Sequence, residues 1–224
     1  QIITVMKKHH FILWILILCV GLISCNNEVE TNLPFEQDSK ANKFEDLKNN
    51  ITRITQLIYK ECYDEENIDY DKMDRILQEN GFPTLLDFSK TRSNRTISSV
   101  DLAKSHLSEN QIVILDKILL LKEPTKEDFE KIKIESSATL EGKELETMLL
   151  AIDGIEAVYL GIKEGVSSSI QTRGVNAMTF ICNLNASGIG TIWGAVAGGI
   201  AASTGVGLVV GLVVGAAVST ISCG

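Results

Sequence analysis

The chain has 224 residues, of which 45% are hydrophobic and 22% are charged, and its formal net charge is −8. An acidic surface disfavours the phosphate contacts that dominate nucleic-acid binding, and it disfavours simple electrostatic attachment to anionic lipid. The charge is unevenly distributed, because no Asp, Glu, Lys, Arg or His follows Arg173.

The first 24 residues have the layout of an exported precursor. A few residues precede Met6 and are interpreted as upstream read-through. Lys7 and Lys8 form a positive n-region, and Phe11–Leu22 forms a short apolar h-region, which is the pattern of a secretory signal peptide. An uncleaved signal anchor is the alternative.

The end of this segment, Leu22-Ile23-Ser24-Cys25, resembles the lipobox of bacterial lipoproteins. The resemblance implies that Cys25 is attached to membrane lipid and becomes the mature N-terminus after cleavage behind Ser24. Residues 25–41 would then form a flexible tether. Glu28 and Glu30 follow Cys25 closely and no Asp comes directly after it. This pattern resembles that of Bacteroidota-like lipoproteins and favours the outer membrane, with the protein facing the periplasm or the cell surface.

Residues 42–172 are predicted to form an acidic, α-helical domain with one modest core. Apolar residues recur at helical spacing in Asn42–Tyr63 and Asp69–Asn80. Ser108, with Gln111 three residues later, predicts a capping box at the start of the next helix.

Two further helices and a linker are predicted after this point. Pro124-Thr125 begins one helix, and Gly142–Gly161 supplies the other, with Asp153-Gly154 as a potential interruption. Residues 173–187 are interpreted as a linker between the domain and the tail. Within it, Ala177–Cys182 is either a strand or the lead-in to the tail.

The tail, residues 188–222, is the most unusual part of the chain. Gly188–Ile221 contains 34 residues, nine of them glycine and none charged. An apolar run of 18 or more residues is interpreted first as membrane-inserting. Ala202–Gly205 is the natural break, which favours a hairpin in or partly through the bilayer over one span from Val206–Ile221. A buried helical hairpin in a soluble domain is the third possibility.

The tail's glycines recur every four residues in two sets, which would form smooth strips on two helices: Gly190, Gly194, Gly198, and Gly207, Gly211, Gly215. The tail resembles the glycine-zipper segments of bacterial outer-membrane lipoproteins. The resemblance implies that paired helices associate in or at the membrane, with self-association or an envelope protein as partner. The expected fold class is all-α, a small helical domain followed by a Gly-rich apolar helical hairpin.

Cys182 and Cys223 bracket the glycine-rich run. If the run is a hairpin, both cysteines lie at the same end and can form a disulfide, which would stabilise the fold by about 4 kcal/mol in the chain-entropy model. Three free thiols, or pairing through Cys62, are the alternatives.

No motif in the sequence indicates an enzyme. His106 is the only histidine after Cys25 and has no cysteine or second histidine nearby. There is no nucleophile elbow and no glycine loop placed to bind phosphate between a strand and a helix. We expect no metal, no cofactor and no nucleic-acid partner.

Two functions fit these features. The first is a non-catalytic cell-envelope lipoprotein with a helical interaction domain and a membrane-associating tail. The alternative is a bacteriocin-like or pore-forming antibacterial protein, in which the helical domain shields the hairpin until it inserts into a target membrane.

Overall fold

The computed structural model describes residues 35–64, 67–84, 98–168, 177–186 and 188–223. Glu36–Gly224 forms one compact unit, and Gln1–Phe35 forms a second, of which only Phe35 is described. The signal peptide, Cys25 and most of the predicted tether therefore lie outside the described residues.

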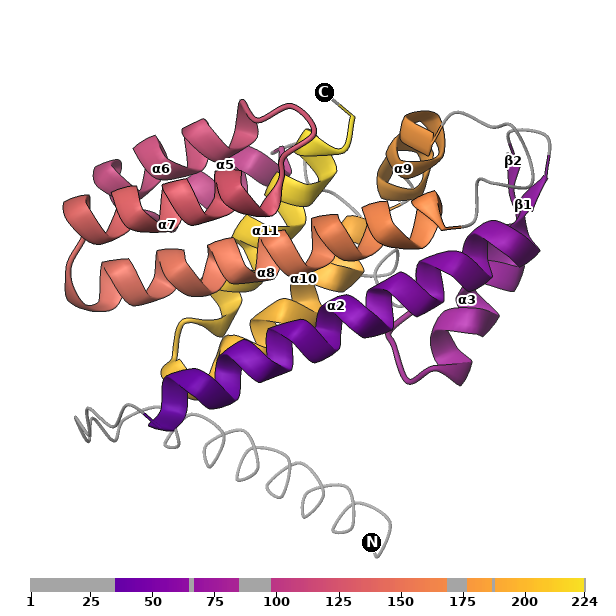
Figure 1. Ribbon diagram of the computed structural model, residues 1–224, viewed down its shortest axis with the longest axis horizontal. Helices are drawn as coiled ribbons and strands as arrows, with labels where there is room; N and C mark the ends of the chain where they lie inside the picture. Colours follow the sequence, from indigo (N-terminus) through magenta and orange to yellow (C-terminus); the bar gives the residue numbers. More distant parts are fainter. Residues whose placement is uncertain (1–34, 65–66, 85–97, 169–176, 187, 224) are drawn as a thin grey trace, which may run out of the picture. The chain divides into compact units, whose positions relative to one another are not determined.

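The fold is all-α, as predicted (Figure 1). Its helices are α2 (Phe35–Cys62), α3 (Tyr70–Glu79), α5 (Ser99–Lys104), α6 (Glu109–Leu119), α7 (Lys126–Thr139), α8 (Gly142–Ser167), α9 (Ala177–Ala186), α10 (Ile189–Ala201), the 3-10 turn η2 (Ala202–Thr204) and α11 (Gly207–Ile221). The short strands β1 (Tyr63–Asp64) and β2 (Asn67–Ile68) pair antiparallel after α2.

Side-chain caps fix where several helices begin. The Ser108 side chain accepts from the Gln111 backbone and the Gln111 side chain accepts from the Ser108 backbone, so the predicted capping box at α6 is confirmed. A second box joins Thr125 and Asp128 at α7, the start predicted from Pro124-Thr125. These caps satisfy backbone N–H groups that have no partner within the helix.

Helix α8 is a central packing element of the fold. It contacts α7, α9, α10 and α11, and the predicted interruption at Asp153-Gly154 does not occur. A Cβ added at Gly154 would lie 2.7 Å from Val214 Cγ2 of α11 and 3.3 Å from Ala197 Cβ of α10. Gly154 is therefore a packing position of α8, where the absent side chain leaves room for the C-terminal helices.

A close backbone contact also joins α8 to α2. A Cβ at Gly161 would lie 2.9 Å from the Lys48 carbonyl oxygen, and one at Gly165 would lie 2.7 Å from the Thr52 carbonyl oxygen. The core of α2 follows the predicted period, with Ile51, Ile54 and Ile58 fully buried on this side. The glycines allow the two helices to approach more closely than side chains would permit.

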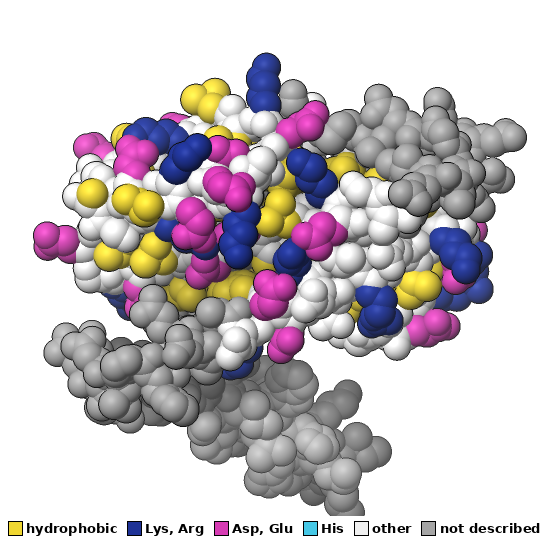
Figure 2. Space-filling model, in the orientation of Figure 1, with side chains coloured by type: hydrophobic (Ala, Val, Ile, Leu, Met, Phe, Trp, Pro, Cys, Tyr) yellow, Lys and Arg dark blue, Asp and Glu magenta, His cyan; other side chains and the backbone are white. Residues whose placement is uncertain are grey.

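Ionic contacts hold α7 on the other side of α8. Lys133 Nζ lies 2.8 Å from both Asp153 Oδ1 and Glu156 Oε2, and 2.9 Å from Glu130 Oε1. Burial by itself would lower the pKa of Lys133, but the surrounding carboxylates outweigh it and the pKa is raised. Charges of both signs are interspersed over the face formed by α2, α7 and α8 (Figure 2).

The tail belongs to the core of the same compact unit. Helix α11 packs against α5, α6, α8, α9 and α10 (Figure 1). Its buried side chains include Val210, Val213, Val214 and Val218. The chain therefore does not divide into two compact units at the predicted boundary between the helical domain and the tail. Among the described residues, no helix combines the length and apolarity needed to cross a membrane.

Part of the predicted linker, residues 173–187, is helical, and its residues 173–176 and 187 lie outside the described residues. Ala177–Ala186 forms helix α9, with Phe180, Ile181 and Leu184 buried. The alternative of a strand at Ala177–Cys182 does not occur. Apolar residues at positions 180, 181 and 184 have helical spacing, but the run is too short for its period to separate a helix from a strand.

A Gly→Ala change at the α2–α8 contact is expected to have the opposite effect to the same change on an exposed helix face. Gly165→Ala should lower the free energy of unfolding by about 2–3 kcal/mol, because its methyl group would overlap the Thr52 carbonyl. Gly199→Ala should raise it by about 0.5–1 kcal/mol, because nothing lies within 4 Å of that Cβ and alanine favours the helix. Urea denaturation measures both. Equal shifts would contradict the close contact.

Candidate functional site: the α10–α11 helix pair

The uncharged C-terminal segment forms two helices that break at the predicted position. Helix α10 ends at Ala201, and the η2 turn leads to Gly205, whose φ of 72° is left-handed. Glycine adopts this conformation without the steric cost that a Cβ would bring. The chain then enters α11, which runs along α10. The chain therefore changes direction at the η2 turn.

The six glycines proposed for helix packing lie at the contact between α10 and α11. A Cβ at Gly194 would lie 2.5 Å from the Gly211 carbonyl oxygen, and one at Gly198 would lie 2.5 Å from the Gly207 carbonyl oxygen. At the other end, a Cβ on Gly215 would lie 3.3 Å from the Gly190 carbonyl oxygen. The two glycine sets therefore face each other within the folded unit, backbone against backbone.

The contact is not uniform along its length. Gly194, Gly198 and Gly207 leave no room for a methyl group, since each added Cβ would lie 2.5 Å from a backbone oxygen. At Gly211 the nearest atom would be 3.0 Å away and at Gly215 it would be 3.3 Å away. The helices are thus closest near the turn and in the middle of α10.

Cys182 and Cys223 form a disulfide, with their Cα atoms 4.7 Å apart. The bond joins α9 to the residues that follow α11, at the end of the pair opposite η2 (Figure 1). Both ends of the glycine-rich segment are therefore covalently held on one side of the domain. Cys62, the other described cysteine, is a buried free thiol whose burial raises its pKa to about 11, so it is a poor nucleophile at neutral pH.

An aromatic cluster secures α9 against the end of α2. The Phe180 ring lies 4.9 Å from the Tyr59 ring and 4.8 Å from the Tyr63 ring, measured between centroids and in edge-to-face geometry. Such pairs add to the free energy of burial by about 0.5–1.5 kcal/mol each. Helix α9 is thus held by the disulfide at one side and by this cluster at the other.

The turn end of the pair is exposed. Ala202, Ser203 and Gly205 are exposed, and Leu208 retains 71% of its accessible surface. Lys143 of α8 comes within 3.9 Å of where a Cβ at Gly205 would lie, but the turn itself carries no charge. The domain therefore presents an uncharged loop with one large apolar side chain.

Near the opposite end, the Trp193 indole is fully buried and packs edge-on against Phe82 with centroids 5.0 Å apart. Its Nε1–H finds no acceptor among the described residues. A buried donor without an acceptor destabilises a fold by about 1–3 kcal/mol.

Within the described ranges, no group of three or more His, Cys, Asp or Glu side chains is placed to hold a metal ion. His106, considered for such a role, lies exposed after α5. Comparison of the chain with protein-family models, curated proteins and solved structures finds no match.

Three glycines of α8 that were not predicted as packing positions also lie at close helix contacts, as those of the tail do: Gly154, Gly161 and Gly165. Gly161 and Gly165 lie four residues apart, the same spacing that singled out the tail glycines. Applying that criterion to the whole chain would have found them. Gly154 has no such partner, and its contact with α10 and α11 depends on the tertiary fold.

The graded contact predicts graded tolerance to alanine along one helix pair. Gly194→Ala and Gly198→Ala should each lower the free energy of unfolding by about 2–3 kcal/mol, because the backbone of α11 cannot move away without disturbing α8. Gly215→Ala should stay within about 1 kcal/mol of the parent, since the tighter fit is offset by better helix propensity. Thermal or urea unfolding of the three variants is the measurement. Equal losses at all three positions would contradict the graded separation.

Proposed function

We propose that the chain is a non-catalytic lipoprotein of a bacterial cell envelope, anchored through Cys25, whose helical domain is an interaction module. The observation that supports it best is the Cys182–Cys223 disulfide within the folded unit. Disulfides persist in oxidising compartments outside the cytosol. The basic and apolar segments before Cys25 resemble those of an exported precursor, so sequence and disulfide both support the proposal of export.

On this proposal, the chain contacts membrane lipid through acylated Cys25 and is located at the outer membrane, facing the periplasm or the cell surface. The three tail glycines of α10 pack against the three of α11. A protein partner therefore binds the exposed helix faces while α10 and α11 remain paired, and association through the glycine strips requires the pair to separate.

The anchor is tested by comparing two cysteines of the N-terminal segment. Cys25→Ser should abolish palmitate incorporation and leave an unprocessed precursor, because the serine hydroxyl cannot form the thioether. Cys19→Ser, within the apolar h-region, should be labelled and processed normally. Metabolic labelling and mass spectrometry measure both properties. A labelled, processed Cys25→Ser protein would refute the anchor.

A second function is favoured by one specific feature: an uncharged helix pair, α10 and α11, is packed inside a charged domain. Exposed turn residues carry no charge, Leu208 projects at the turn, and the Trp193 N–H lacks an acceptor in the described part of the chain. Tryptophan is favoured at membrane interfaces, where its N–H can meet a polar group. On this proposal the protein is bacteriocin-like or pore-forming, and α10–α11 inserts into a target membrane after leaving the domain.

The disulfide restricts how such an insertion could occur. Because Cys182 and Cys223 are joined, the two ends of the segment must stay on the same side of the bilayer. Helices of 13 and 15 residues are about 20–22 Å long, against about 30 Å of hydrocarbon. The turn would therefore enter first, and the pair would reach into the bilayer without either helix crossing it.

Tying α10 to α8 tests whether the pair must leave the domain. A Cβ at Gly154 would lie 3.3 Å from Ala197 Cβ, close to disulfide geometry, and Val214 Cγ2 is the obstructing atom. We therefore combine Gly154→Cys and Ala197→Cys with Val214→Ala in the unlipidated mature chain. If insertion is the function, this locked form should release at least tenfold less dye from phosphatidylethanolamine–phosphatidylglycerol vesicles than the parent.

The matched control replaces Gly154→Cys by Gly154→Ser in the same background, which keeps the packing change but cannot form the bond. It should release dye like the parent chain. If the parent releases no dye at micromolar concentration, the insertion proposal is wrong. Equal release by locked and control proteins would show that permeabilisation does not involve separation of α10 from α8.

A further inference from the structure

The start of α2 and the η2 turn lie at the same end of the compact unit (Figure 1). Helix α2 runs parallel to α8, since a Cβ at Gly154 would lie 3.5 Å from Phe44 Cε1 and one at Gly165 would lie 2.7 Å from the Thr52 carbonyl oxygen. Helix α2 therefore begins beside the first half of α8.

The η2 turn lies beside the same half of α8. A Cβ at Gly205 would lie 3.9 Å from Nζ of Lys143, the second residue of α8. Ala197, one turn before the end of α10, is the residue that approaches Gly154. The end at which the chain enters the compact unit, at Glu36, is therefore also the end that presents the turn.

The surface of the turn is uncharged and partly apolar. Ala202, Ser203 and Gly205 are exposed, and Leu208 retains 71% of its accessible surface. Apolar side chains that are only partly buried flank these residues: Ile200, Val209 and Leu212. Contact with lipid removes water from a protein surface, which costs little where no charge has to be desolvated. By contrast, charges of both signs cover the face formed by α2, α7 and α8 (Figure 2).

The charges beside the turn come from the start of α8. Glu141, Lys143 and Glu144 are exposed there, and one ammonium group with two carboxylates gives a formal charge of −1. This balance gives no attraction to anionic lipid. It suits a zwitterionic headgroup layer, in which the Lys143 ammonium can meet a phosphate.

The length of chain before α2 favours the same end. Phe35 lies ten positions after Cys25, a distance of at most about 36 Å when fully extended. The disulfide end of the unit lies near Tyr59, where Phe180 of α9 packs, about 35 Å along α2 from Glu36. A chain anchored at Cys25 could place that end on a membrane only by extending fully, which is entropically unfavourable. The turn end is within reach of a slack chain.

We infer that the folded domain docks with its turn end on a zwitterionic phospholipid surface, with Ala202 and Leu208 in contact with lipid. The inference rests on the proposed anchor at Cys25 and specifies how the anchored domain meets the membrane. One leucine is too little to hold a protein on a bilayer by itself, but the tether keeps the turn at a high local concentration beside it. In this docking α10 and α11 stay packed in the domain, unlike in insertion of the hairpin.

Hydrogen exchange of the mature chain tests the docking. The Cys25 thiol is coupled to maleimide–phosphatidylethanolamine in phosphatidylcholine vesicles; Cys62 is buried, and Cys182 and Cys223 are joined to each other. Amides of residues 202–208 should exchange more slowly in the coupled than in the free chain, by about threefold or more, while those of α8 stay unchanged. Because the coupling replaces natural acylation, a failure here is separate from a failure of the anchor, which the labelling of Cys25→Ser measures.

Two exposed leucines provide a matched pair of variants. Leu208→Asp should abolish the slowing at residues 202–208, because a carboxylate would have to be desolvated at the lipid surface. Leu120→Asp changes a leucine that is 79% exposed and should keep the slowing. Gln111 of α6 donates to the Glu144 backbone near the turn end, and Leu120 follows the other end of that helix.

Each remaining outcome overturns the docking. Unchanged exchange at residues 202–208 on coupling would show that the turn does not meet lipid, and equal slowing in Leu208→Asp and the parent would assign the contact to other residues. Faster exchange in α8 on coupling would show that α10 and α11 leave the domain, as in insertion. Slowing that appears without vesicles as the concentration of free chain rises would show contact between two copies instead of with lipid.

Discussion

The structure depends on backbone-to-backbone contact at glycine between α10 and α11. Six helical glycines would by themselves oppose helix formation by about 1 kcal/mol each relative to alanine. Their carbonyl groups lie where the opposite helix would carry Cβ atoms, as at Gly194 and Gly211. The lost propensity is offset by close packing and by burial of the valines of α11, each worth about 1.5–3 kcal/mol. Without the other helix, each helix would lose this close packing and valine burial and keep its poor helix propensity, so the pair behaves as one element.

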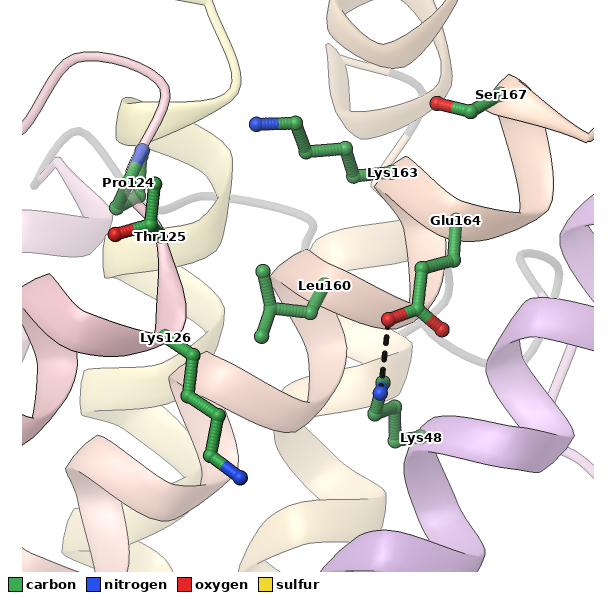
Figure 3. Close-up of a pocket in the computed structure, with 8 residues that line it drawn as sticks. All are labelled: Lys48, Pro124, Thr125, Lys126, Leu160, Lys163, Glu164 and Ser167. Carbon is green, nitrogen blue, oxygen red and sulfur yellow. Dashed lines mark ion pairs between the residues drawn. The ribbon is translucent and has the colours of Figure 1, made fainter.

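Helix α8 extends the same constraint through the rest of the domain. Gly154 admits the α10–α11 pair on one face, while Gly161 and Gly165 admit α2 on another. Helix α7 packs on α8 through buried Phe129, whose ring contacts Tyr159, and through the Lys133 ion pairs. Between α2 and α7, Leu160 and Lys163 of α8 line a surface pocket (Figure 3).

Local physics accounts for what the sequence could predict. The all-α class, the Ser108 capping box and the break at Ala202–Gly205 depend on residues within one turn of each other. Three further features could not be read this way. Helix α9 is short, so its apolar spacing is ambiguous. Gly154 matters only because Ala197 and Val214 lie next to it. The surface pocket between α2, α7 and α8 is lined by residues more than 70 positions apart, such as Lys48 and Leu160 (Figure 3). The uncharged tail was ambiguous for a related reason, since apolar residues suit a protein core as well as a bilayer.

The disulfide supports export, on which the first proposal depends, and it also restricts how the second function could operate. By joining Cys182 to Cys223 it holds both ends of the glycine-rich segment beside α9, which is itself fixed to α2 by Tyr59 and Phe180. Separation of α10 and α11 at the turn would leave this base intact, whereas separation at the base would require the bond to break. The exposed and uncharged Ala202–Gly205 end carries no such covalent link. On the first proposal the domain acts as an interaction module with α10 and α11 paired, and on the second the disulfide would keep both ends of the pair together during insertion.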